Sequence, residues 1–328
     1  MSFIARVTPR RPIAFVMLMV FLAACSSTSD AGDSDPGNHE QKIDEIVAVT
    51  SNVHQFKLDV SRMRTLARSL NAATAGYPPD VIFLQEIESN GVRELVRVLN
   101  DILPEGDFRS AGPLTRHVKA KAIVNLAAND VDGFSVWTDA CDTRSRYLEL
   151  RLSRRDTSAR YSAAGVHLPW DAMSECRERN ATLLKEKVAI NPAIIAGDLN
   201  SRAVVEQREC DLAETSDPLG WYSILTSDAG GPAFRDSVKT QALRTEQPVG
   251  EQWTYEGIGP TEICDGSRAF RRNRIDYIFV RGVSVLDAGA DDPGWAGATP
   301  GTFKCSNEEE CRYSDHRFVF ARLGLEDD

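Results

Sequence analysis

The sequence is short of positive charge. It carries 38 Lys and Arg against 48 Asp and Glu, which gives a formal net charge of -10. Proteins that hold nucleic acid by general electrostatics use Lys and Arg to displace counterions from phosphates, so this chain does not fit that class. An anionic substrate must therefore meet a local basic patch or a metal ion.

The N-terminus lacks an apolar run long enough to cross a bilayer, which takes about 20 residues. The run from Ile13 to Phe21 is shorter, and it follows Arg6, Arg10 and Arg11. A basic start, a short apolar run and small residues after it predict a secretory signal peptide. A buried N-terminal helix is the alternative, which the absence of amphipathic spacing disfavours.

The residues after this run resemble the lipobox of bacterial lipoproteins, with Leu22-Ala23-Ala24-Cys25 in place. The resemblance implies that residues 1–24 are removed, that Cys25 is lipidated and that the chain is exported and anchored to a membrane. Ser26 and Ser27 after the Cys favour the outer membrane by the sorting rule of such lipoproteins. Residues 25–42 are rich in Ser, Asp and Gly and predict a flexible tether.

Zinc-binding cysteine motifs are also missing. There is no Cys-x-x-Cys pair and no His at zinc-finger spacing, which argues against a cysteine-based metal site. Apart from Cys25 the chain has an even set of cysteines, which suits an oxidising compartment: Cys141, Cys176, Cys210, Cys264, Cys305 and Cys311. The sequence does not choose among their pairings, although Cys305 and Cys311 could close a short loop.

Strand and helix patterns alternate along the rest of the chain. Apolar runs at Glu45–Ser51 and Val81–Leu84 predict strands, and each precedes apolar residues at helical spacing, from Val60 to Leu70 and from Val92 to Ile102. The later predicted elements are strands at Ala120–Leu126, Phe134–Thr138, Tyr147–Leu152, Tyr161–Val166, Ala193–Ala196, Ile275–Val280 and Phe318–Arg322, and a helix at Ala172–Val188.

This order predicts an α/β fold with two sheets in the core and helices outside. The stretch Ser201–Asn273 has little periodicity and several Gly and Pro residues, so it predicts surface loops around a site. No internal repeat or interior linker is present. The sequence therefore predicts one domain, residues 43–325.

Polar side chains follow several of the predicted strands directly. They are Asn52, Glu86, His167, Asp198, Asn200, Asp276, Asp315 and His316. Taken singly, an acid at a strand end is commonly a helix cap or turn residue, a histidine is commonly a core residue, and Asp276 could pair with Arg274. Together they supply metal ligands, a base, an amide donor and two imidazoles, which favours a catalytic site.

The motifs around these residues resemble the endonuclease/exonuclease/phosphatase superfamily, the fold of deoxyribonuclease I, from about Ile46 to Leu323. They are Thr50-x-Asn52, Leu84-Gln85-Glu86, Gly165-Val166-His167-Leu168, Gly197-Asp198-Leu199-Asn200, Arg274-Ile275-Asp276-Tyr277 and Ser314-Asp315-His316, in the order of the family. The resemblance implies a four-layer α/β/β/α sandwich of two packed mixed sheets flanked by helices, and hydrolysis of phosphoric esters.

The resemblance also implies roles for the site residues. Asn52, Glu86 and Asp315 would hold Mg²⁺, with Mn²⁺ or Ca²⁺ as alternatives. Asp198 would take the proton of the attacking water, the Asn200 amide would grip the phosphate, and Asp276 would orient His316 and keep it protonated. His167 matches the deoxyribonuclease-I-like and sphingomyelinase-like members, whereas abasic-site endonucleases carry Asn there.

The substrate contacts are less defined by the sequence. Arg271, Arg272 and Arg274 form a candidate phosphate-binding patch, which Lys119, Lys121, Arg144 and Arg146 could join. The alternative is that these are solvated charges at strand ends. Trp253 and Tyr255 are candidates for a substrate rim, although core packing is the favoured role for both. The segment Ala120–Val124 departs from relatives that carry Gly before the Ala-Ile pair. This difference concerns the substrate groove and not the hydrolytic residues.

Three functions are therefore compared. The first is a nuclease-like phosphodiesterase outside the cytoplasm, and the second is the same site acting on a phospholipid, sphingomyelin or an inositol phosphate. The third is a non-catalytic surface binding protein, which the retention of every motif disfavours. A monomer without a protein partner is expected.

Overall fold

The computed structural model describes residues 44–54, 60–169, 174–201, 220–247, 252–262, 268–290 and 314–325. The predicted signal peptide, Cys25 and the tether lie outside the described residues, as do Cys210, Cys264, Cys305 and Cys311. No helix in the described ranges has the length and apolar character needed to cross a membrane.

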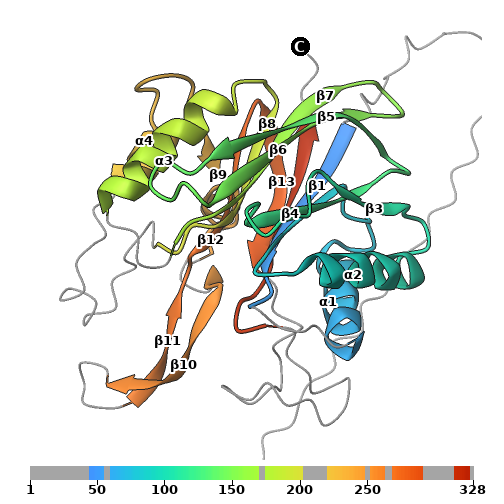
Figure 1. Cartoon of the computed structure of the whole chain (residues 1–328), viewed down its shortest axis with the longest axis horizontal. Helices are drawn as coiled ribbons and strands as arrows, with labels where there is room; N and C mark the ends of the chain where they lie inside the picture. Colours follow the sequence, from blue (N-terminus) through green and yellow to red (C-terminus); the bar gives the residue numbers. More distant parts are fainter. Residues whose placement is uncertain are drawn as a thin grey trace, which may run out of the picture. The chain divides into compact units, whose positions relative to one another are not determined.

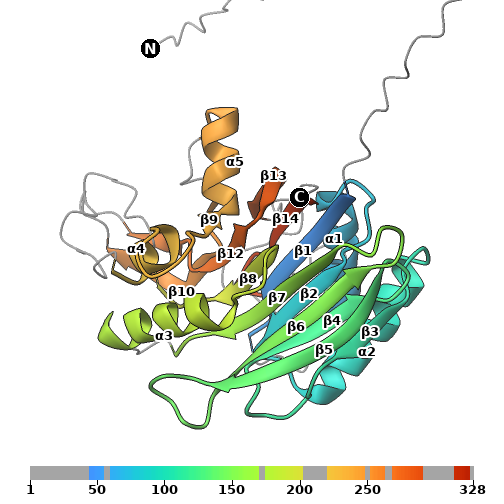
Figure 2. The ribbon, with the colours of Figure 1, turned by 90° about the horizontal axis from the view of Figure 1, so that it is seen from above.

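Two six-stranded mixed sheets form the framework (Figures 1 and 2). The first sheet has the spatial order β13 (Val283–Ala290), β14 (Val319–Leu325), β1 (Asp44–Asn52), β2 (Val81–Gln85), β4 (Ala120–Asn125) and β3 (Phe108–Ala111). The second has the order β5 (Asn129–Thr138), β6 (Arg146–Arg154), β7 (Arg160–His167), β8 (Ala193–Asp198), β12 (Asp276–Arg281) and β9 (Arg235–Asp236).

Each sheet contains one parallel pair, β1 with β2 and β7 with β8, and the other pairings are antiparallel. The helix α1 (Val60–Ala73) lies between β1 and β2 in the chain, and α3 (Ser174–Lys187) lies between β7 and β8. A helical crossover is the usual connection between parallel strands. The two sheets thus repeat the same strand–helix–strand arrangement.

Helices cover the outer faces of the two sheets. Figure 1 shows α1 and α2 (Ser89–Ile102) on one side, and α3 and α4 (Gly220–Thr226) on the other. The helix α5 (Ser237–Thr245) packs against β13 and β12, and β10 (Tyr255–Glu262) with β11 (Arg268–Asn273) forms a separate two-stranded sheet. The predicted four-layer α/β/β/α sandwich is confirmed.

Three groups of buried side chains correspond to the three contacts between layers. Leu148 and Leu150 of β6 point between the sheets with Phe83 and Ile278, while Tyr147 of the same strand points toward α3 and α4. Alternate residues of a strand face opposite sides, so a strand covered on both faces is apolar throughout. That is why the run Val81–Leu84 is uninterrupted.

The sheets approach each other closely at Gly165, two residues before the end of β7. A Cβ atom at this position would lie 2.3 Å from Cδ1 of Phe83 and 2.9 Å from Cβ of Ala120. Both of those residues belong to the first sheet, whereas Gly165 belongs to the second. The absence of a side chain at Gly165 is therefore a requirement of the sheet-to-sheet contact.

The prediction of surface loops over Ser201–Asn273 was wrong in part. This stretch contains α4, β9, α5 and the β10–β11 pair, and β3 and β13 elsewhere were also missed. These elements are short or pack at the border of the core, so their apolar pattern is brief. In α4 the apolar residues Trp221, Tyr222 and Leu225 are buried against the second sheet. In α5 the Asp236 side chain caps the helix by accepting from the Lys239 amide at 3.2 Å.

Candidate active site

The strand register brings the predicted polar residues to one edge of the paired sheets. β1 ends with Asn52 opposite Gln85, which precedes Glu86. In the second sheet Asp198 pairs with His167 on one side and with Asp276 on the other. The carboxyl ends of the parallel strands and the amino ends of their antiparallel neighbours therefore meet at the same edge.

Asp198 lies at the centre of this edge and is fully buried. Its Oδ2 accepts from Asn52 Nδ2 at 2.8 Å, and its Oδ1 accepts from the Asn200 amide nitrogen of the backbone at 2.7 Å. Burial and the nearby Asp276 carboxylate raise the pKa of Asp198 to about 7, against the opposing effects of His316 and the two donors. A carboxylate with a pKa near neutrality is suited to accept a proton in catalysis.

The backbone turns directly after Asp198. Asn200 adopts a left-handed conformation with φ of 48°, which returns its N–H to the Asp198 carboxylate. Its side-chain Nδ2 donates to the Leu168 carbonyl at 2.7 Å. The predicted phosphate contact therefore requires the second hydrogen of the Asn200 amide.

His316 and Asp276 form a buried pair. Nδ1 of His316 lies 2.9 Å from Oδ2 of Asp276, and both side chains are almost completely enclosed. Burial alone would lower the pKa of His316, but Asp276 and, more weakly, Asp198 and Asp315 raise it to about 10. The imidazole is therefore a cation at neutral pH.

Neighbouring residues hold this pair in place, and the sequence did not single all of them out. Oγ1 of Thr254 accepts from the Asp276 amide nitrogen at 3.1 Å, and the ring of Tyr255 lies 5.0 Å from the His316 ring, centroid to centroid. Tyr255 thus contacts the site, whereas Trp253 packs beside the core between the first sheet and its helices. The sequence favoured core packing for both residues, which is confirmed for Trp253, whereas Tyr255 contacts the site.

Glu86 and Asp315 lie close to Asn52 and His54. Nδ2 of Asn52 donates to Oε1 of Glu86 at 3.2 Å. Nδ1 of His54 lies 3.9 Å from Oε2 of Glu86 and 3.4 Å from Oδ2 of Asp315. The Nδ2 of Asn52 faces Glu86, while its Oδ1 accepts from the His54 amide nitrogen at 2.9 Å. Carboxylate and amide oxygens are the hard donors that Mg²⁺ prefers, so the chemistry of the predicted ligands fits a divalent cation, which would require the Asn52 amide to turn and His54 to move aside. His54 was missed, although it stands two residues after Asn52.

A second group of potential ligand atoms, from Asp198, Asp276 and His316, lies within 4.8 Å of one another. His316 is poorly suited to this ligand group as long as it is a cation, because a protonated imidazole has no lone pair for a metal. The His316 cation also already compensates the charges of Asp198 and Asp276.

His167 faces the gap between these two groups. Its Nε2 lies 3.7 Å from Oε1 of Glu86 and 3.7 Å from Oδ2 of Asp198. Burial lowers the pKa of His167 to about 4, with the His316 cation adding to the effect and Glu86 opposing it. The ring is therefore neutral and can donate or accept a hydrogen bond without a change of charge.

Of the predicted arginine patch, the structure describes only the side chain of Arg274. Arg274 is engaged with the buried Asp236 carboxylate at 2.8 Å and lies over the Tyr277 ring at 4.7 Å, so the prediction of a substrate contact by Arg274 is corrected. The possible pairing of Arg274 with Asp276 is likewise not seen. Lys121 is buried, and its Nζ donates to the carbonyls of Thr115 and Val118. The side chains of Arg271 and Arg272 lie outside the described residues.

Comparison with known proteins agrees with this architecture. No curated protein matches the chain in sequence. Similar solved structures include humanized D. rerio TDP2 with 18% identity and a TM-score of 0.53, covering 85% of this chain and 99% of that one. An endonuclease/exonuclease/phosphatase family protein from Bacteroides thetaiotaomicron has 17% identity and a TM-score of 0.56, covering 87% and 100%.

A third similar structure is D. rerio TDP2 in complex with a single-strand DNA product, with 16% identity, a TM-score of 0.53 and coverage of 85% and 99%. At these identities the likeness concerns the fold. The sequence profile of the Endonuclease/Exonuclease/phosphatase family, however, matches residues 49–316, which include all eight predicted site residues. The chain therefore belongs to the endonuclease/exonuclease/phosphatase family.

Proposed function

We propose that this chain is an exported, membrane-anchored phosphodiesterase that hydrolyses nucleic acid with the help of a divalent cation. Members of its family are phosphoric ester hydrolases that depend on divalent metals. The observation that carries the proposal is the meeting of Asn52, Asp198 and Glu86 through hydrogen bonds of 2.8 and 3.2 Å, with the His316–Asp276 pair beside them.

Each of these residues has its own role in hydrolysis. Asp198, held by Asn52 and Asn200, accepts the proton of the attacking water. The His316 cation, fixed by Asp276, stabilises the negative charge that gathers on the phosphate oxygens in the transition state. Neutral His167 contributes a hydrogen bond to the phosphate without adding charge.

Asn52, Glu86 and Asp315 would hold the cation, with Mg²⁺ as the ion we favour. When bound there, the ion supplies Lewis-acid polarisation of the phosphate and compensates its charge. This is necessary in a protein whose own net charge is -10.

Nucleic acid is favoured as the substrate by the complex of D. rerio TDP2 with a single-strand DNA product among the similar folds. The second candidate is a phospholipid or inositol phosphate, which is favoured by the predicted lipid anchor at Cys25. A non-catalytic binding role is disfavoured, since every motif residue is retained and the acid, base and imidazole groups converge.

A substrate panel tests the function. The purified chain is given plasmid DNA, RNA, sphingomyelin and inositol phosphates with Mg²⁺ or Mn²⁺. Hydrolysis is followed by gel for the nucleic acids, by release of phosphocholine for sphingomyelin and by release of phosphate for the inositol phosphates. The Asp198→Asn variant should lose nearly all activity, while Asp132→Asn, an exposed acid on β5, should match the parent. Equal activity of the parent and Asp198→Asn would reject the site, and hydrolysis of lipid alone would select the second candidate.

Membrane anchoring is tested separately. Cys25→Ser should move the chain from the membrane fraction to the soluble fraction of the host cell. Retention of the Cys25→Ser variant in the membrane fraction would contradict the lipid anchor without affecting the catalytic proposal.

A further inference from the structure

We propose that Arg116, Lys119, Arg144 and Arg146, here called the basic patch, bind the backbone phosphates of a nucleic acid strand beside the scissile phosphate. The inference rests on the proposed function and specifies its substrate as an extended polyanion, in contrast to a single small phosphate ester. The sequence suggested three of these residues as additions to an arginine cluster whose member Arg274 is committed elsewhere.

Backbone hydrogen bonds bring the basic patch together from two sheets. Val118 and Arg146 form an isolated parallel bridge, the Lys119 amide donates to the Arg146 carbonyl at 3.2 Å, and the Arg146 amide donates to the His117 carbonyl at 2.8 Å. His117 Nδ1 also lies 3.0 Å from the Arg144 carbonyl oxygen. The segment before β4 and the segment before β6 therefore run together, and their cations lie along one strip.

The strip lies at the same edge of the sheets as the candidate active site. β4 begins at Ala120, which pairs with Gln85, the residue before Glu86. β6 and β7 are antiparallel, with Leu148 opposite Gly165. Continuing this register by two residues places Arg146 opposite His167.

The charges of the basic patch remain available to a ligand. Arg144 has 86% of its side chain exposed, and its contact with Asp142 is long at 3.5 Å. Arg116 is exposed, and Lys119 and Arg146 are half-buried. The Nη1 of Arg146 donates to the carbonyls of Thr143 and Ser145, which are neutral acceptors and leave its charge uncompensated. The other acid of this region, Asp139, is buried, and its carboxylate accepts from the Tyr147 hydroxyl and two backbone amides. Positive charge therefore predominates on the exposed side of the strip.

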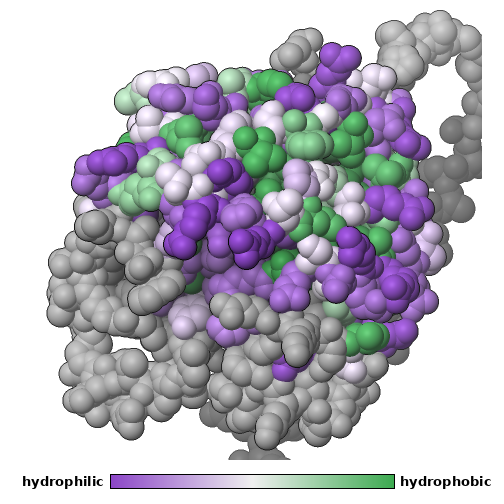
Figure 3. Space-filling view, in the orientation of Figure 1, coloured by the Kyte–Doolittle hydropathy of each residue, from purple (hydrophilic) through white to green (hydrophobic). Residues whose placement is uncertain are grey.

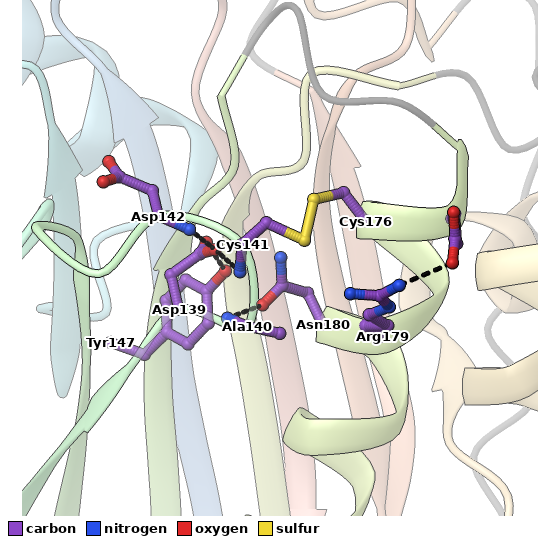
Figure 4. The surroundings of a disulfide bond; sticks show 9 residues. Asp139, Ala140, Cys141, Asp142, Tyr147, Cys176, Arg179 and Asn180 are labelled. Atoms are coloured by element: carbon purple, nitrogen blue, oxygen red, sulfur yellow. Dashed lines mark hydrogen bonds and ion pairs between the residues drawn. A yellow bond between two sulfur atoms is a disulfide. The ribbon is translucent and has the colours of Figure 1, made fainter.

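The loop that carries Arg144 is held to the neighbouring helix. Figure 4 shows the disulfide between Cys141 and Cys176, which joins this loop to α3, and beside it the Ala140 amide donates to Oδ1 of Asn180 at 2.9 Å. A cation on an anchored loop loses less conformational freedom when it binds a phosphate, which favours affinity.

The chemistry of the strip favours nucleic acid over a lipid surface. Lipid surfaces are bound by apolar side chains together with cations. Among the described residues, none of the exposed large hydrophobic side chains belongs to the two segments of the basic patch. On the face seen in Figure 3, apolar residues lie interspersed among hydrophilic ones. A row of cations leading away from the reacting edge instead matches a chain of phosphates.

Binding of a fluorescein-labelled single-stranded DNA oligonucleotide at increasing salt tests the proposal. The chain carries Asp198→Asn to prevent hydrolysis, and its affinity is measured by fluorescence anisotropy with and without Arg116→Gln, Lys119→Gln and Arg144→Gln together. Each phosphate contact on a single strand contributes about 0.7 to the slope of log affinity against log salt, so the triple variant should lower that slope by about 2.

The matched control is Arg155→Gln with Arg160→Gln, which removes exposed arginines at the opposite ends of β6 and β7 and should leave the slope unchanged. Circular dichroism checks the fold of each variant, and Arg144→Gln alone, on an exposed side chain, replaces the triple variant if that one unfolds. An unchanged slope in the patch variant overturns the proposal. Patch-dependent binding to phosphatidylglycerol vesicles without binding to DNA overturns the choice of nucleic acid. Failure of the proposed function would appear in the substrate panel, as the absence of hydrolysis by the parent chain.

Discussion

Replacing Asp276 by Asn removes one negative charge from the buried contact with His316 and keeps the size of the side chain. At the 2.9 Å separation of the two atoms, the attraction is about 6 kcal/mol with an effective dielectric constant of about 20. The rise of the His316 pKa from 6.5 to about 10 corresponds to about 5 kcal/mol, which is the same order. Most of this stabilisation of the cation should disappear in the variant.

The expected result is a fall in kcat by a factor of about 10²–10⁴ at neutral pH, because His316 no longer carries the charge that the transition state needs. NMR of the imidazole nitrogens should show a neutral ring in the variant and a protonated ring in the parent. Because the pKa of His316 is raised in the folded state, the pair stabilises the fold fully below pH 6.5 and loses this effect as pH rises through about 10. The difference in Tm should follow the same course. Asp132→Asn serves as the control, and an Asp276→Asn variant with the parent's kcat and a neutral ring would refute the reasoning.

Three further results are expected. Glu86→Gln should weaken Mn²⁺ binding by at least about tenfold in calorimetry, since a principal carboxylate ligand is lost, whereas Glu94→Gln on the exposed face of α2 should bind like the parent. Removal of the disulfide by Cys141→Ser should lower the free energy of unfolding by about 4 kcal/mol in denaturant titrations, because the bond to Cys176 closes a loop of 35 residues in the unfolded chain. Reduction of the parent should cause an equal loss. Burial raises the pKa of Glu149, so the folded state favours the protonated form and its stability falls as pH rises above the ordinary pKa of 4.5. The Glu149→Gln variant should therefore be more stable than the parent at pH 7. A gain in stability that persists at pH 3 would contradict this reasoning.

The sequence predicted the central strands well because burial on both faces leaves a strong signal. Val81–Leu84 and Ala193–Ala196 are short, apolar and covered by a sheet on one side and helices on the other. It failed where an element is brief and makes its contacts at the border of the core. The strand β13 illustrates this, because its half-buried residues alternate irregularly around a register shift between Val285 and Asp287.

The residues of the site that lie at strand ends could also be predicted from the sequence. Residues at strand ends, such as Glu86 and Asp198, are fixed by the register of the strands that carry them, so the periodic pattern and the family motifs point to them together. Arg274 shows the limit of this approach, since its charge suggested a substrate contact until the fold placed the Asp236 carboxylate beside it. The partner of a charged side chain is set by tertiary structure, and Asp236 is 38 residues away in sequence.

The proposed catalytic groups come from two sets of strand ends, with Asn52 and Glu86 at the ends of β1 and β2 of the first sheet and Asp198 and Asp276 at the ends of β8 and β12 of the second. The distance between the two sets of groups therefore depends on the side chains that pack between the two sheets. Gly165 permits a close contact between the sheets two residues before His167, near the proposed reacting groups. A single added methyl group there would separate proton acceptor from cation by tenths of an ångström, so turnover should suffer from enlargement of this contact well before the fold itself does.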